Sequence, residues 1–139
     1  MQISTCLNCH CTIHYRKSQS HGKYCSNKCQ QELQNKNLIE SWIQGTWNGL
    51  KRGLILSTVV RNHLIKLSNN KCSSCGWNQI NPFTNKIPLE IDHIDGNCEN
   101  TKPENLRVLC PNCHSLTSTF RALNKGKGNK TRLKYNKLI

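Results

Sequence analysis

Asp92 and His93 stand side by side in LEIDHIDGN, residues 89 to 97, where an apolar stretch gives way to a polar loop. A carboxylate is a hard oxygen ligand for Mg²⁺ or Mn²⁺, and an imidazole titrating near neutrality can take a proton from water. Successive side chains of a strand point to opposite faces, so these two cannot both ligate one ion without a bend. We therefore expect Asp92 and a later imidazole, His114, to bind a divalent ion while His93 acts as a general base. Such a set suits phosphodiester hydrolysis. The alternative is that Asp92 caps the loop and His93 merely packs.

Eight of the ten cysteines form four short-spaced pairs. The N-terminal segment MQISTCLNCH lacks the charged start and apolar run of a secretory signal, so we expect a reducing cytosol, where paired cysteines more often bind zinc than form disulfides. Two such pairs complete one tetrahedral zinc site. The sequence thus predicts two structural zinc sites, the first formed by Cys6, Cys9, Cys25 and Cys29 and the second by Cys72, Cys75, Cys110 and Cys113.

Two cysteines, Cys11 and Cys98, remain outside these pairs. Each is expected to be an ordinary small side chain. The first zinc site nevertheless keeps alternatives, because four nearby residues could replace one of its ligands: His10, Cys11, His14 and His21.

The formal net charge is +13, and no acidic residue follows Glu104. A basic flank of this kind predicts a polyanionic partner, most often nucleic acid, although a solvated tail that only aids solubility is the alternative. No stretch approaches membrane-spanning length, so no membrane partner is expected. Arg107 or Arg121 could clamp a phosphate or could simply be a surface residue. The residues expected to contact nucleic acid are Arg107, Arg121, Lys125, Lys127 and Lys130.

The length of 139 residues leaves room for one domain or two small modules, and only 35% of the residues are hydrophobic. Hydrophobic burial alone would leave such a fold marginal, so we expect crosslinks to help stabilise it. We expect a small α+β, zinc-stabilised protein with an apolar helical pattern at about 26–44 and a glycine-rich linker at 45–53. The predicted domains are a four-cysteine zinc module at 1–30, helix and linker at 31–56, a second zinc-bound module at 57–124, and a flexible basic tail at 125–139.

The second module must position the reactive residues. A helix capped by Ser57 or Thr58, with Val60 and Leu64 on one side, is expected to end at Asn69 and Asn70. We expect His63 to pack rather than bind metal, and Trp47 to pack rather than stack on a base. The remaining elements are predicted as a strand at 87–92, a loop at 93–105, a strand at 106–110 and a helix at 111–123.

LEIDHIDGN followed by PENLRVLCPNCHSLT, inside a frame of two Cys-x2-Cys pairs, resembles the HNH endonuclease family over residues 54 to 124. The resemblance implies a ββα-metal, treble-clef-like domain that hydrolyses DNA to a 3′-hydroxyl and a 5′-phosphate with the help of Mg²⁺ or Mn²⁺. It assigns His93 as base and Asp92 with His114 as metal ligands. It also implies that Asn105 braces the loop and so orients the base. CLNC with KYCSNKC resembles the small zinc module found ahead of this domain in phage and intron-associated HNH proteins.

Two other classes of protein remain compatible with the composition: a non-catalytic zinc-finger DNA-binding protein, and an RNA-binding or structural zinc protein. The first class gives no reason for Asp92, His93, Asn105 and His114 to occur together, and against the second only the family resemblance favours DNA over RNA. In the loop, Asp95, Asn97 and Asn100 could add a metal ligand or only shape the turn. The sequence leaves the target site, the number of strands cut, the biological role and the oligomeric state open. The expected location is the cytoplasm, that of a host cell if the protein is phage-encoded.

Overall fold

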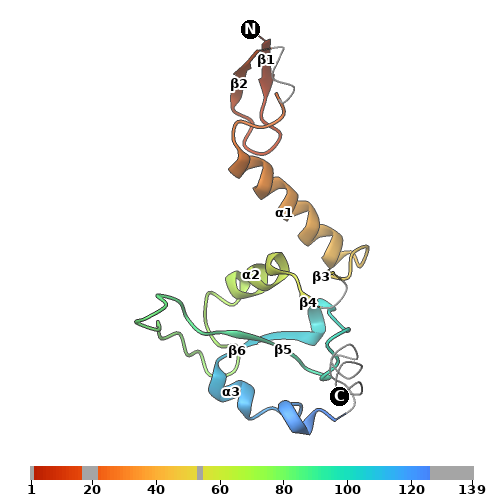
Figure 1. Cartoon of the computed structure of the whole chain (residues 1–139), viewed down its shortest axis with the longest axis vertical. Helices are drawn as coiled ribbons and strands as arrows, with labels where there is room; N and C mark the ends of the chain where they lie inside the picture. Colours follow the sequence, from red (N-terminus) through yellow and green to blue (C-terminus); the bar gives the residue numbers. More distant parts are fainter. Residues whose placement is uncertain (1, 17–21, 53–54, 126–139) are drawn as a thin grey trace, which may run out of the picture. The chain divides into compact units, whose positions relative to one another are not determined.

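The computed structural model describes residues 2–16, 22–52 and 55–125 (Figure 1). The chain divides into two compact units, Met1–Ser41 and Trp42–Ile139, and the division falls inside helix α1 (Asn27–Ile43). In the part of the chain that the structure describes, no helix is long and apolar enough to cross a membrane. The four domain limits expected from the sequence stay predictions.

The first unit is a short hairpin followed by helix α1. Strand β1 (Gln2–Thr5) pairs antiparallel with β2 (Thr12–Tyr15), and the turn between them contains Cys6 and Cys9. Helix α1 matches the predicted range closely, and the hydroxyl of Ser26 accepts the N–H of Cys29 at 3.2 Å in its first turn. The sequence analysis did not predict the hairpin, because its two strands have only four residues each.

In the second unit, helix α2 (Thr58–Leu67) begins as predicted, because the Ser57 hydroxyl accepts the N–H of Val60 at 3.2 Å. The linker prediction for 45–53 was wrong in part. Strand β3 (Leu50–Lys51) pairs antiparallel with β4 (Ile55–Leu56), and this hairpin satisfies backbone groups that a linker would leave to water.

A third hairpin, formed by β5 (Glu90–His93) and β6 (Leu106–Leu109), contains Asp92 and His93. The predicted strand at 87–92 starts three residues too early, because the N–H of Leu89 bonds to the carbonyl of Ile87 and turns the chain before the ladder begins. Asp92 lies opposite Arg107, and His93 lies opposite Leu106. The 3-10 turn η1 (Pro103–Asn105) leads directly into β6.

Helix α3 (Pro111–Ser115) is much shorter than the predicted helix at 111–123. The hydroxyl of Ser115 donates to the carbonyl of Asn112, and that of Thr117 donates to the carbonyl of His114. Side chains that bond to nearby carbonyls in this way compete with the helical ladder. A second 3-10 turn, η2 (Arg121–Leu123), follows, and it starts at a residue with φ of +46°.

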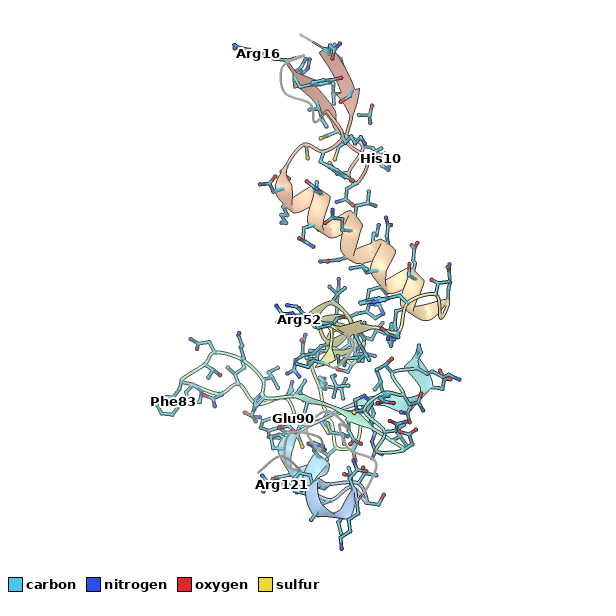
Figure 2. All side chains as sticks on the ribbon, turned by 45° about the vertical axis from the view of Figure 1, so that its right-hand side comes forward. His10, Arg16, Arg52, Phe83, Glu90 and Arg121 are labelled. Atoms are coloured by element: carbon cyan, nitrogen blue, oxygen red, sulfur yellow. The ribbon has the colours of Figure 1, made fainter. Side chains whose placement is uncertain are left out.

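The two helices α2 and α3 lie on opposite sides of the β5–β6 hairpin (Figure 1). Side chains of this hairpin, of Leu89 just before it and of α2 form the small apolar core, whose buried aliphatic members are Val60, Leu64, Leu89, Leu106, Val108 and Leu109. The segment before β5 instead projects outward, and Phe83 at its tip is 92% exposed (Figure 2). The buried core therefore comes from α2 and the hairpin, whereas α3, which contains His114, contributes no buried residue.

Candidate active site and metal centres

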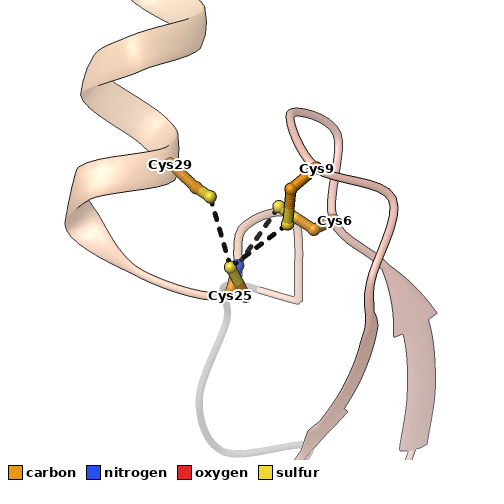
Figure 3. Close-up of side chains that lie close together, drawn as sticks. All are labelled: Cys6, Cys9, Cys25 and Cys29. Atoms are coloured by element: carbon orange, nitrogen blue, oxygen red, sulfur yellow. Dashed lines mark hydrogen bonds between the residues drawn. The ribbon is translucent and has the colours of Figure 1, made fainter.

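The first cysteine cluster is assembled by the β1–β2 turn and the start of α1. Four sulfur atoms lie within 4.8 Å of one another here. They belong to Cys6, Cys9, Cys25 and Cys29 (Figure 3). Cys25 Sγ lies 3.3 Å from Cys29 Sγ and 3.6 Å from Cys9 Sγ. Sulfurs bound to one tetrahedral zinc at about 2.3 Å lie roughly 3.8 Å apart, so this group could hold a zinc ion.

Cys11 lies beside the first cluster, with its sulfur 3.4 Å from that of Cys9, but it is not one of the four that group together. Among the proposed substitutes, His10 and His14 are described and do not belong to the group either, whereas His21 lies outside the described residues. The four thiols predicted from spacing are therefore the ones that the structure brings together.

The second cluster joins a turn before β5 to the start of α3. The four sulfurs of this cluster also lie within 4.8 Å of one another, and those of Cys75 and Cys110 are 3.7 Å apart. The cluster consists of Cys72, Cys75, Cys110 and Cys113. Cys110 caps α3, because its side chain accepts the N–H of Cys113. This group could likewise hold a zinc ion, and such an ion would tie α3 to the segment that precedes β5.

Backbone N–H groups favour the thiolate form of one cysteine in each cluster. The N–H of Cys9 is the main cause that lowers the pKa of Cys6 to about 6. Burial opposes ionisation of Cys72, but the N–H groups of Cys110 and Cys75 bring its pKa down to about 6. The pKa of a second cysteine in each cluster moves the other way: it is raised for Cys25, chiefly by Cys29, and raised to about 12 for Cys113, chiefly by Cys75.

Asp92 is buried, with 5% of its surface exposed, and its two oxygens face different partners. The Nε of Arg107, its cross-strand neighbour, donates to Oδ2 at 2.7 Å. The other oxygen, Oδ1, lies 3.6 Å from Nε2 of His114. Arg107 thus fixes the orientation of the carboxylate and leaves one oxygen directed toward the imidazole. Its expected contact with a DNA phosphate stays a prediction.

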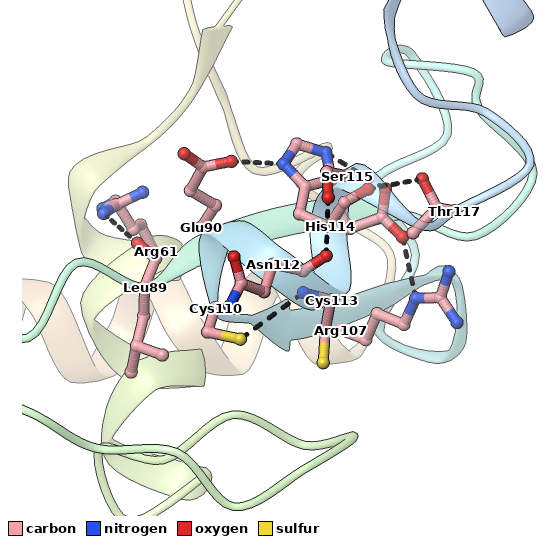
Figure 4. A network of polar contacts seen from close by, with 11 residues as sticks. Arg61, Leu89, Glu90, Arg107, Cys110, Asn112, Cys113, His114, Ser115 and Thr117 are labelled. Atoms are coloured by element: carbon pink, nitrogen blue, oxygen red, sulfur yellow. Dashed lines mark hydrogen bonds and ion pairs between the residues drawn. The ribbon is translucent and has the colours of Figure 1, made fainter.

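His114 comes from α3 and reaches over the face of β5 that contains Glu90 and Asp92 (Figure 4). Its Nδ1 contacts Oε2 of Glu90, while its Nε2 faces Asp92. The ring of Phe120 packs edge-on against the imidazole at a centroid distance of 5.3 Å. Two ligands that lie about 2.1 Å from one ion are roughly 3 Å apart at a right angle and farther apart at wider angles. The separation of 3.6 Å between Asp92 Oδ1 and His114 Nε2 is compatible with a shared divalent ion.

His93 is the last residue of β5 and, by strand alternation, belongs to the opposite face from Asp92. Among the described residues, its Nε2 is a buried polar atom with no hydrogen-bond partner. Burial lowers the pKa of this imidazole, although the carboxylates of Asp95 and Asp92 partly counteract the shift. A neutral imidazole has one nitrogen with a lone pair, which is the atom that a general base uses.

Asn105 fixes the loop that follows His93. Its side-chain amide donates to Asp95 Oδ1 at 2.9 Å and to the carbonyl of Asn100 at 2.7 Å, and its side-chain oxygen accepts the N–H of Asp95. The side chain of Asn100 also donates to Asp95, and these bonds hold the pKa of Asp95 at about 2. Because Asp95 and Asn100 bond within the loop, the structure places them as turn-forming residues. Asn97 joins them, since its side chain accepts the N–H of Glu99.

Only some of the residues predicted to contact DNA lie in the part of the chain that the structure describes. Arg121 and Lys125 are exposed, and the guanidinium of Arg121 lies 5.0 Å from the centre of the Phe120 ring. Lys127 and Lys130, like the rest of the predicted tail beyond Lys125, lie outside the described residues. Trp47 is half-buried and lines a cavity of about 430 Å³.

The sequence analysis missed Glu90 and the pairing of Arg107 with Asp92. Strand alternation could have identified Glu90, because it stands two residues before Asp92 and therefore on the same face. The pairing of Arg107 needed the register of β5 and β6, which the sequence alone does not define.

No family model and no solved structure matches the chain. Over 76 residues, the chain is 42% identical to the H-N-H endonuclease F-TflIV of Escherichia phage T5. The match covers 52% of this chain and 32% of the phage protein, so the chain spans about a third of the length of that relative. The chain is thus similar over about half of its length to an H-N-H endonuclease, and its small mixed α/β structure contains two four-cysteine clusters.

Proposed function

We propose that this chain is a metal-dependent DNA endonuclease in which β5, β6 and α3 form the ββα-metal catalytic unit. The observation that carries the proposal is the approach of Asp92 Oδ1 to His114 Nε2, 3.6 Å apart on one face of β5. It occurs in a chain whose phage relative is described as an H-N-H endonuclease.

In this proposal, Asp92 and His114 hold a Mg²⁺ or Mn²⁺ ion. One carboxylate and one imidazole leave several coordination positions for water and for phosphate oxygens. The bound ion supplies positive charge that stabilises the phosphate group as negative charge develops during cleavage. Arg107 contributes by holding the second oxygen of Asp92, so that the carboxylate keeps its orientation.

His93 is proposed as the general base that takes a proton from the attacking water. A base must be unprotonated at working pH, and burial of His93 lowers its pKa and so favours the neutral ring. Asn105 is proposed to support this role, because its bonds to Asp95 and Asn100 define the loop that begins at His93.

The two four-cysteine clusters are proposed to bind structural zinc, and DNA is the proposed partner. The net charge of +13 favours binding through phosphates, which weakens steeply as salt concentration rises. Arg121 and Lys125 are the exposed, described residues proposed to contribute to this binding. A phage relative and a DNA substrate favour action in the cytoplasm of a host cell.

The experiment that tests the proposal compares the zinc-loaded protein with His93→Ala on supercoiled plasmid, with and without Mg²⁺ or Mn²⁺. We expect metal-dependent nicking or linearisation by the wild type. We expect activity at least 100-fold lower in the variant, because a general base contributes about 10²- to 10⁴-fold to rate. DNA affinity should be unchanged, because His93 is not a proposed DNA contact. Zinc content of both proteins serves as the control for folding.

An intact plasmid despite tight binding by both proteins would contradict nuclease activity on that substrate. A repeat on phage genomic DNA then separates an enzyme that requires a particular site from a non-catalytic zinc-finger protein. Equal cleavage by wild type and His93→Ala would instead support nuclease activity but reject His93 as the general base.

A further inference from the structure

The imidazole of His114 lies between two carboxylates that come from the same face of β5. Oε2 of Glu90 contacts Nδ1 (Figure 4). Oδ1 of Asp92 lies 3.6 Å from Nε2. Glu90 and Asp92 are two residues apart in a strand, so both side chains point toward α3. The two ring nitrogens of His114 therefore have different partners and can serve different purposes.

The chemistry of the Glu90 contact determines which nitrogen has a free lone pair. A histidine that binds a metal ion is a neutral imidazole with one N–H and one lone pair, whereas an ionised carboxylate can only accept hydrogen bonds. A hydrogen bond between Glu90 and Nδ1 thus requires the proton on Nδ1. The lone pair is then on Nε2, the nitrogen that faces Asp92.

The exposure of Glu90 argues against a role in stability alone. Its side chain is 49% exposed and that of His114 is 24% exposed. An ion pair at such a surface contributes little to the free energy of unfolding, because water screens the charges. Glu90 can nevertheless hold His114 in one tautomer and one ring orientation, because a hydrogen bond to Nδ1 is enough for that.

We propose that Glu90 is the positioning residue of the metal site, accepting the N–H at Nδ1 of His114 and so directing the Nε2 lone pair toward the ion shared with Asp92. This role rests on the proposed function. Residues that bond the second nitrogen of a metal-binding histidine fix its tautomer and raise its basicity. Glu90 touches neither the ion nor the substrate.

The first test is a titration of the zinc-loaded protein with Mn²⁺, in which the free ion is followed by electron paramagnetic resonance. We expect Glu90→Ala to bind Mn²⁺ roughly 10- to 100-fold more weakly than the wild type. Glu90→Gln keeps an oxygen that accepts the Nδ1 proton, so it should recover a large part of the affinity. The exposed Glu104, on turn η1, provides the matched control, and Glu104→Gln should bind as the wild type does.

The second readout is the ¹⁵N NMR spectrum of the His114 ring in zinc-loaded protein before Mn²⁺ is added. The wild type should carry its proton on Nδ1, and Glu90→Ala should lose that preference. A residue that only added stability would leave the tautomer of His114 unchanged. Equal Mn²⁺ affinity and an unchanged tautomer in Glu90→Ala would therefore overturn the positioning role.

Asp92→Asn and His114→Ala distinguish failure of this inference from failure of the proposed function. If Mn²⁺ affinity depends on Asp92 and His114 but not on Glu90, only the positioning role is rejected. If affinity depends on neither ligand in proteins that retain their zinc, the proposed metal site is wrong and the role of Glu90 is rejected with it.

Discussion

His63 and His93 are two imidazoles of the second unit whose pKa burial lowers. The two imidazoles nevertheless have different neighbours, which indicates different roles. His63 packs edge-on against Trp42, with 6.2 Å between ring centres, and nearby Lys66 lowers its pKa further. His93 instead has two carboxylates near it that oppose the shift. We therefore expect protonation of His63 to affect stability rather than chemistry.

The pH dependence of stability tests this view of His63. Its folded-state pKa lies below the ordinary value near 6.5, so the unfolded chain binds a proton more readily and stability is lost as pH falls through that value. Between pH 7.5 and 5.5, the free energy of unfolding should fall more in the wild type than in His63→Gln. Urea unfolding of the zinc-saturated proteins measures both slopes. Protonation of the zinc thiolates is common to the two proteins, and identical slopes would show that His63 does not contribute.

The sequence predicted the residues of the site better than their contacts. The two cysteine quartets were predictable because metal ligands recur at short spacing and need no knowledge of the fold. The proximity of Asp92 and His114 also followed, since a helix beginning at a zinc turn must return to the strand. The contacts of Arg107 and Glu90 depend on strand register and on the exact path of α3. Neither property is encoded in a short motif.

At the scale of elements, Gly96 shows how the loop after β5 is closed. It has φ of +73°, and a Cβ placed there would lie 2.8 Å from Thr119 Cγ2 and closer still to Asn124 Oδ1. The side chain of Asn124 also donates to the carbonyl of Gly96 at 2.7 Å. The segment after α3 thus packs directly on the backbone of this loop, and only glycine allows the approach.

Gly45 offers a matched comparison, because its φ of +74° is nearly the same but no atom lies within 4 Å of the position that a Cβ would take there. Each Gly→Ala substitution should cost about 1 to 2 kcal/mol for the left-handed conformation. Gly96→Ala should lose more stability than Gly45→Ala, since Thr119 and Asn124 must move away. Urea unfolding of the two variants checks the difference, and equal losses would mean that the segment after α3 adapts freely.

The elements themselves were predicted unevenly, for physical reasons. Helix α2 was predicted well, because Ser57 supplies a cap and its apolar residues recur with helical spacing. The length of α3 was not, because hydroxyl groups of Ser115 and Thr117 bond to nearby carbonyls and end the helix early. Strands of two to four residues, such as β3 and β1, contain too few residues to show alternation.

At the scale of the whole molecule, each compact unit contains one complete cysteine quartet. Zinc binding contributes free energy directly to the folding of small modules. We expect the wild type to bind two zinc ions and Cys6→Ser or Cys72→Ser to bind one. Cys72→Ser should unfold the second unit and so abolish the proposed DNA cleavage, whereas Cys6→Ser should leave the second unit folded.

Native mass spectrometry and amide NMR spectra test whether the two units fold independently of each other. The first method counts the bound zinc ions, and the second shows which unit has lost its structure. Simultaneous loss of both ions and of all dispersed signals in Cys6→Ser would show instead that the chain folds as one cooperative unit.

Helix α3 places a cysteine of the second quartet, Cys113, immediately before His114. A chelator such as EDTA would therefore stop an active protein by two routes. Removal of the ion at Asp92 would be rapid and reversed by added Mg²⁺, whereas removal of zinc from the quartet would be slow and reversed only by refolding with zinc. Inhibition by a chelator alone does not identify the catalytic metal in a protein with this arrangement. The catalytic metal is identified instead by the order in which added metals restore activity.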